Sequence, residues 1–191
     1  MNEKEPNFYN QENVEETETQ SKVERIFEVD DKTLRQVVQI EKDCFPEDMQ
    51  ESEEEIRKIL ENKNGIHLKL ENNGAIVGYI TSLKQDQEFD LLKESDADLK
   101  NEQGSLYLHS IDITPKNRNL KNFNALFGEL IDEAKKENYK KVTMYARTSN
   151  RFSSILQKRY GAKFFRSIKD WRNLGEDMDY LEIDLPKTAE E

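Results

Sequence analysis

LYLHSIDITPKNRNLKNFNALF, residues 106–127, is the stretch that decides the fold. Its first part, Leu106 to Ile113, alternates apolar and polar side chains and is rich in branched residues, which predicts a strand. Pro115 ends this strand, because proline has no N–H group to donate and disfavours helix at the residue before it. After a polar loop at 116–122, a helix is predicted to run to about residue 138. Apolar residues recur on one face of that helix: Phe123, Leu126, Phe127, Leu130, Ile131 and Ala134.

The loop between this strand and this helix is basic, since it holds Arg118 and Lys121. The first N–H groups of a helix have no partner inside the helix, and the helix dipole is positive at that end. A strand, a basic loop and a helix N-terminus in this order are therefore suited to binding phosphate. The alternative is a solvated connection with no ligand.

Composition indicates one domain with acidic additions. The chain has 191 residues, of which 36% are charged, and its net charge is −11. Residues 1–21 hold six acids and one base, and residues 85–104 hold seven acids and two bases, so the rest is nearly neutral. A neutral body argues against a nucleic-acid surface, which needs a basic patch. We expect a disordered acidic tail at 1–21, a domain at 22–185 with a flexible acidic insertion at 84–104, and a polar tail at 186–191.

The cellular compartment is predicted from three features that the sequence lacks: a second cysteine, a membrane-spanning segment and a secretory signal. Cys44 is the only cysteine, which excludes a disulfide within the chain and fits a reducing environment. No apolar run approaches the roughly 18 residues of a membrane span, and residues 1–20 lack the apolar core of a secretory signal. We therefore expect a cytoplasmic protein, as a monomer or homodimer, that contacts no membrane.

Local signals predict the remaining elements. Asp30 or Asp31 caps a helix, Ser52 with Glu55 forms a capping box for a second helix, and the sequence Asn72-Asn73-Gly74 joins two strands as a hairpin. Strands are predicted at 22–29, 66–71, 75–83, 142–146, 162–168 and 179–185, and helices at about 32–44, 53–62 and 150–161. The predicted order is β-α-α-β-β-β-α-β-α-β-β.

This order and the stretch at 106–127 resemble the GCN5-related N-acetyltransferases, the GNAT superfamily. Ile113-Thr114-Pro115 matches the family's valine–x–proline step, and the six residues from Arg118 to Phe123 align with its loop Arg/Gln-x-x-Gly-x-Gly/Ala. Both loop glycines are replaced, by Lys121 and Phe123. The resemblance covers residues 22–185 and implies an α/β fold with a mixed, mostly antiparallel twisted sheet flanked by helices. It also implies acetyl-CoA as the acetyl donor and an amine of a small molecule or protein as the acceptor.

The resemblance implies site residues as well. His109 occupies the strand position where many family members carry a glutamate that acts as general base, and histidine titrates near neutrality. Asp112 is an alternative base, and a purely structural histidine is another. Coenzyme A would bind in the gap between the strands at 106–113 and 142–146, and its pyrophosphate would lie on the loop. The implied cofactor residues are Ile111, Ile113, Arg118, Asn119, Leu120, Lys121, Asn122, Phe123 and Asn150.

The last matches lie in the C-terminal third. Asn150 to Gly161 resembles the family's asparagine-led helix, but the family's proton-donating tyrosine falls on Gln157, and Tyr160 is expected to pack in the core. Phe45, Trp171 and Asp177 resemble substrate-facing residues, with Trp171 covering a core edge as the alternative. We assign no metal ligands. The sequence therefore predicts an N-acetyltransferase, or alternatively a relative that has lost catalysis and acts as a binding or regulatory module.

Overall fold

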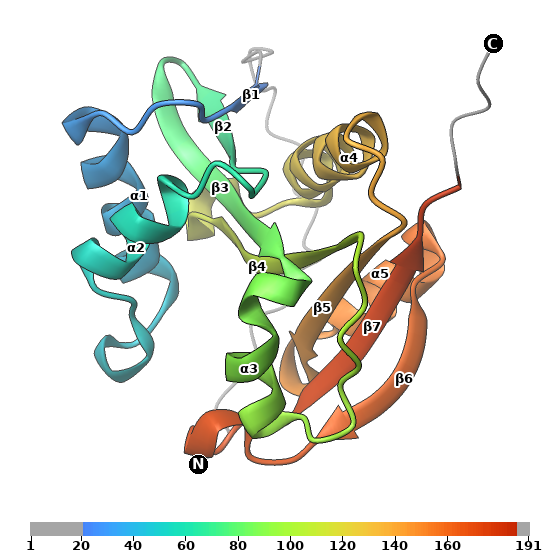
Figure 1. Cartoon of the computed structure of the whole chain (residues 1–191). Coiled ribbons are helices and arrows are strands. Elements are labelled where there is room, and N and C mark those ends of the chain that lie inside the picture. The colour runs from blue at the N-terminus through green and yellow to red at the C-terminus, as the bar shows by residue number, and fades with distance from the viewer. Residues whose placement is uncertain (1–20, 187–191) are drawn as a thin grey trace, which may run out of the picture.

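The computed structural model describes residues 21–186, which form one seven-stranded sheet with helices on both faces (Figure 1). The strands are β1 (Lys22–Arg25), β2 (Leu68–Asn72), β3 (Ala75–Lys84), β4 (Ser105–Ile113), β5 (Lys141–Arg147), β6 (Lys163–Ile168) and β7 (Met178–Asp184). Their order in the sheet is β1-β2-β3-β4-β5-β7-β6. Every neighbouring pair is antiparallel except β4 and β5, which are parallel. The predicted fold class is confirmed.

The helices are α1 (Asp31–Cys44), α2 (Glu53–Leu60), α3 (Gln85–Ser95), α4 (Leu120–Lys136) and α5 (Phe152–Tyr160), with short 3-10 turns η1 (Glu47–Met49), η2 (Pro115–Asn117), η3 (Thr148–Asn150) and η4 (Trp171–Asn173). Figure 1 shows α1 and α2 on one side of the sheet and α4 on the other. Leu126, Phe127 and Leu130 of α4 pack with Leu156 of α5 in the largest core cluster. Leu34, Val37 and Ile40 of α1 pack with Ile56 and Leu60 of α2 in a second one.

The capping and turn signals read from the sequence are confirmed. The side chain of Asp30 accepts a hydrogen bond from the Thr33 N–H group at the start of α1. Ser52 and Glu55 form the reciprocal capping box of α2. At the β2–β3 turn, Asn73 and Gly74 adopt φ angles of 52° and 77°, the left-handed conformation that a two-residue hairpin requires.

The expectation of a flexible segment at 84–104 is wrong. Residues 85–95 form α3, and the side chains of Leu92 and Leu99 are almost fully buried. Both belong to a third apolar cluster with Tyr107, Trp171 and Tyr180. These partners are distant in sequence, and their apolar surface offsets the acidic composition of the segment, which on its own suggested disorder.

Other boundaries differ by a few residues. The helix predicted from Phe123 begins at Leu120, because Asn119 caps it, its side chain accepting from the Asn122 N–H group. The expected tails at 1–21 and 186–191 lie almost wholly outside the described residues. Between residues 21 and 186, no helix is both long and apolar enough to cross a membrane.

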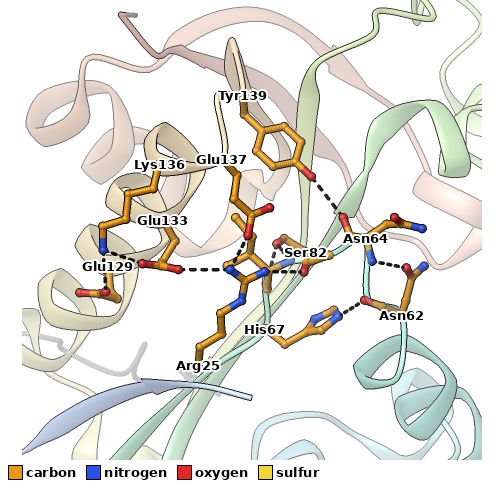
Figure 2. A network of polar contacts seen from close by, with 12 residues as sticks. Arg25, Asn62, Asn64, His67, Ser82, Glu129, Glu133, Lys136, Glu137 and Tyr139 are labelled. Atoms are coloured by element: carbon orange, nitrogen blue, oxygen red, sulfur yellow. Dashed lines mark hydrogen bonds and ion pairs between the residues drawn. The ribbon is translucent and has the colours of Figure 1, made fainter. Parts of the chain in front are cut away.

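A polar network fixes β1 and the start of β2 against α4 (Figure 2). Arg25 of β1 forms ion pairs with Glu133 of α4, at 3.2 Å, and with Glu137, the residue that caps the end of α4. The ring of His67 is buried, and its Nε2 lies 3.0 Å from the Asn62 carbonyl oxygen. Burial lowers the pKa of His67, so this histidine is neutral at physiological pH and belongs to the fold rather than to a reactive site.

Candidate functional site

Strands β4 and β5 separate at the middle of the sheet. Their pairing runs from Ser105 opposite Lys141 to Leu108 opposite Met144 and then stops. Strand β4 continues to Ile113 and β5 to Arg147, so residues 109–113 present a strand edge that β5 does not occupy. An extended ligand with amide groups can pair with such an edge.

A β-bulge at His109 marks the same point. In the β3–β4 pairing Ser82 lies opposite Leu108 and Thr81 opposite Ser110, so His109 is the extra residue. Strand residues normally alternate between faces, but the bulge turns His109 and Ser110 toward the same cleft. Ile111 and Ile113 then pack on the opposite side, against the cluster that contains α4.

This cleft has a volume of about 170 Å³ and lies on the α1 side of the sheet. Four segments line it: the end of α1 with the following loop, β4, β5, and the loop at 171–178. The lining residues are Glu41, Phe45, Met49, Glu51, Tyr107, His109, Ser110, Tyr145, Arg147, Trp171, Arg172, Leu174 and Met178. The structure thus brings together three predicted site residues, His109, Phe45 and Trp171.

His109 and Glu51 form a close polar pair in the cleft. The Nε2 atom of His109 lies 3.2 Å from Oε1 of Glu51, and its Nδ1 lies 3.4 Å from the Thr81 hydroxyl. Burial, together with the positive charge of Arg172, lowers the pKa of His109 to about 4. Burial, reinforced by the charge of Glu41, raises the pKa of Glu51 to about 7. At neutral pH the imidazole is therefore uncharged, and the carboxyl is poised between its two protonation states.

Buried acids lie beside this pair. The Tyr79 hydroxyl donates a 2.6 Å hydrogen bond to Glu41, whose other oxygen accepts from the Glu51 N–H group at 3.1 Å. Glu41 thereby fixes the backbone that carries Glu51. Asp112, the alternative base, is buried and accepts a hydrogen bond from the Ser110 hydroxyl. Burial raises the pKa of Asp112 to about 6, but its side chain does not line the cleft.

The loop at 170–177 closes one side of the cleft. Trp171 is buried, and its ring lies 4.2 Å from the ring of Tyr145. The carboxylate of Asp177 pairs with Lys169 and accepts the Asp170 N–H group. Asp177 therefore holds the loop in shape, and the structure does not place it on the cleft, where a substrate role was expected.

The basic loop lies at the N-terminus of α4, next to the open edge of β4. The Arg118 guanidinium donates to the Ile113 carbonyl oxygen, at 3.3 Å, and to the Cys44 sulfur. The side-chain oxygen of Asn119 accepts a hydrogen bond from the Asn122 N–H group, and its carbonyl oxygen accepts one from the Phe123 N–H group. The N–H groups of Leu120 and Lys121 remain at the free end of the helix. The side chain of Asn122 is turned inward and donates to the Asn117 carbonyl oxygen. Lys121 is exposed.

The stretch 150–161, which resembles the family's asparagine-led helix, places Asn150 and Gln157 on the surface and Tyr160 against the core. The exposed Asn150 lies two residues before α5, and its side-chain oxygen accepts from the N–H group of Phe152, the first residue of that helix. Gln157 is exposed and donates to the Ser153 hydroxyl. Tyr160 packs 4.6 Å from the Phe127 ring and donates to Asn124, so it has the core position expected for it.

Sequence reasoning missed most of the residues that line the cleft, among them Glu51 and Arg172. Glu51 lies in an acidic run, ESEEE, in which nothing distinguishes it from its neighbours. Arg172 follows Trp171 in a polar loop, and its position depends on backbone angles that the sequence does not announce. The signal available for Arg172 was its adjacency to the only tryptophan.

A comparison with known protein families identifies the family to which this sequence is similar. Residues 34–161, more than half of the chain, match the sequence profile of the acetyltransferase (GNAT) family. None of the curated proteins matches the chain.

Solved structures share the fold at low identity. The ribosomal-protein-S18-alanine N-acetyltransferase from Escherichia coli has a TM-score of 0.67 and 15% identity, over 90% of this chain and 97% of that one. A putative acetyltransferase from Acinetobacter baylyi has a TM-score of 0.69 and 15% identity, over 92% and 98%. A GNAT-like decarboxylase, GphF, in complex with isobutyryl-CoA, has a TM-score of 0.66 and 16% identity, over 86% and 100%.

Proposed function

The chain belongs to the GNAT family of acetyltransferases, and on that premise we propose that it transfers the acetyl group of acetyl-CoA to a primary amine held in the cleft. The observation that carries the proposal is the His109–Glu51 pair at the point where β4 leaves β5. A general base, an acceptor cleft and a free strand edge meet there.

The residues beside the cleft suit an acyl-CoA. The open edge of β4 offers backbone groups to an extended chain of amides, and the N-terminus of α4 offers N–H groups and the charges of Arg118 and Lys121 to phosphates. We assign the donor to this path. Its contacts would come from Ile111, Ile113, Arg118, Asn119, Leu120, Lys121 and Asn150, whereas Asn122 and Phe123 are turned inward with their N–H groups bonded to Asn119. Acetyl-CoA, when bound, supplies the acetyl group as a thioester.

In the proposed reaction, the protein's side chains accept a proton from the acceptor amine. An ammonium must lose one proton before its nitrogen lone pair can attack the carbonyl carbon. A second proton leaves the nitrogen as the C–N bond forms and the C–S bond breaks, and it can neutralise the departing coenzyme A thiolate. His109 Nε2 and Glu51 Oε1 lie 3.2 Å apart, so either member of the pair is placed to accept the first of these protons. A base whose pKa is near the working pH is the most effective, and Glu51, with a pKa of about 7, meets this condition.

The test measures thiol release from acetyl-CoA with a panel of amines. Replacing either member of the pair, in His109→Gln or Glu51→Gln, should lower kcat/KM by ~100- to 10,000-fold. The wild-type rate should rise as pH passes about 7, and that limb should be absent in Glu51→Gln. The control is Glu47→Gln, an exposed acid on the same loop, which should behave as wild type.

Other outcomes separate the alternatives. If calorimetry detects no binding of acetyl-CoA, the proposed function fails. If acetyl-CoA binds but neither wild type nor Gln157→Tyr acetylates any amine, the protein is a binding module of the family. If His109→Gln and Glu51→Gln retain full activity, the pair is structural.

A further inference from the structure

Two arginines, Arg147 and Arg172, line the acceptor cleft without a close carboxylate partner in the described part of the chain. Arg147 lies with its guanidinium carbon 5.2 Å from the centre of the Phe45 ring, and Arg172 lies 5.5 Å from the Trp171 ring. Between residues 21 and 186, no carboxylate forms an ion pair with either of them. Aromatic rings hold the two guanidinium groups in place. One Arg147 nitrogen donates to the Met49 sulfur at 3.6 Å, and between residues 21 and 186 no other side-chain hydrogen bond uses the donors of either arginine.

Arg172 is held in a conformation that the chain does not adopt by default. Its φ angle is 53°, and those of Asp170 and Asn173 are 48° and 59°. Left-handed angles at residues other than glycine cost free energy and persist where the surroundings impose them. Here the Trp171 N–H group donates to the Glu176 carbonyl oxygen at 2.7 Å, and the Gly175 N–H group donates to Asp170 at 2.8 Å. The loop is therefore built to present Arg172 on the cleft.

The positive charge of Arg172 affects the pKa values of Glu51 and His109. Burial raises the pKa of Glu51 and lowers that of His109; the charge of Arg172 partly offsets the first shift and adds to the second, so Arg172 lies close enough to act on both groups. An amine brought to this pair as a bare cation would meet that positive charge. An amine that also carries an anion would neutralise it.

We propose that the acceptor is a small amine bearing an anionic group, with its nitrogen facing His109 and Glu51 and its anion held by Arg172, assisted by Arg147. This rests on the proposed function. The cleft volume of about 170 Å³ is below the range of roughly 300–1,000 Å³ typical of sites for drug-sized ligands, which favours a molecule of amino-acid size over a polypeptide.

The test compares matched probes. Tyrosine is paired with tyramine and O-phosphoethanolamine with ethanolamine, so that each pair differs by a carboxylate or a phosphate. A tyrosine-led peptide amide without carboxylates is the third arm. Binding is measured by calorimetry, and acetylation by thiol release, for wild type, Arg172→Gln and Arg159→Gln. Arg159 is an exposed arginine of α5 outside the cleft lining and serves as the control.

We expect wild type to bind at least one anionic probe more tightly than its partner. Arg172→Gln should weaken that binding and raise KM by about ten- to a hundredfold, the effect of losing a charge-assisted hydrogen bond, with little change in kcat. Arg159→Gln should match wild type. If the carboxylate pair alone discriminates, the anion is a carboxylate; if only the phosphate pair does, it is a phosphate.

The remaining results are decisive too. Equal binding of both members in both pairs, or tighter binding of the peptide amide, overturns the inference even if amines are acetylated. Selective, Arg172-dependent binding without any acetylation supports the inference and counts against the proposed function.

Discussion

Replacing Asp112 with asparagine should remove a pH-dependent loss of stability. The Asp112 carboxyl is buried on β4 and accepts from the Ser110 hydroxyl. Burial, with the nearby charge of Glu41, raises its pKa from 3.8 to about 6. Between these two values the folded protein holds a proton that the unfolded chain releases, so the free energy of unfolding falls as pH rises.

The magnitude follows from the size of the shift. About two pKa units at about 1.4 kcal/mol each give a loss of about 3 kcal/mol, complete once pH exceeds the folded value of about 6. Asparagine has no such titration. The stability of Asp112→Asn relative to wild type should therefore increase by about 2 kcal/mol between about pH 4.5 and about pH 7.5, the part of the titration that remains above pH 4.5.

Urea denaturation at several pH values measures this difference. The substitution also has a constant cost or gain from changed hydrogen bonds, so the slope with pH is the quantity to compare. Asp90→Asn, at an exposed aspartate of α3, is the control and should give a flat difference near zero. A flat difference for Asp112→Asn would refute the argument, because the carboxyl would then keep an ordinary pKa in the folded state.

Three further predictions concern the fold and use the same denaturation assay. In Gly65→Ala the new Cβ would lie 2.0 Å from the Ser82 carbonyl oxygen, so we expect a loss of about 1–3 kcal/mol or more, whereas Gly128→Ala, in open space on α4, should gain about 0.5–1 kcal/mol; equal effects would contradict this. Leu92→Ala should cost about 2–5 kcal/mol, because Leu92 is 1% exposed, and a cost under about 0.5 kcal/mol would mean that α3 is not packed. Ser52→Ala removes the α2 cap and should cost about 1 kcal/mol, and no change would show that the capping box is not formed in solution.

Sequence patterns predicted the parts of this protein that depend on neighbours along the chain. The caps at Asp30 and Ser52 and the Asn73-Gly74 turn are local, and their side-chain chemistry determines them. Helix α3 was missed because it is stabilised by burial of Leu92 against residues far along the chain. Local composition does not report such contacts.

The same limit applies to the site. His109 was identified from its distance to Pro115, but the bulge that puts it on the opposite face from Ile111 and Ile113 arises from pairing with β3. Glu51 reaches it because Glu41, on the preceding helix, holds the Glu51 N–H group. Tertiary packing therefore brings His109 and Glu51 together from two separate segments, and of these two residues only His109 could be identified from the sequence.

The loss of both loop glycines has a structural counterpart at the start of α4. Phe123, at the second glycine position, turns into the core, where its ring lies 5.4 Å from that of Phe127, and its N–H group is taken by the Asn119 carbonyl oxygen. An early helix start capped by Asn119 thus replaces a glycine-rich loop. Glycines allow the backbone to approach a phosphate closely, whereas a capped helix end offers fewer free N–H groups. Recognition of a pyrophosphate here would depend more on the charges of Arg118 and Lys121, and charge-based recognition weakens with salt.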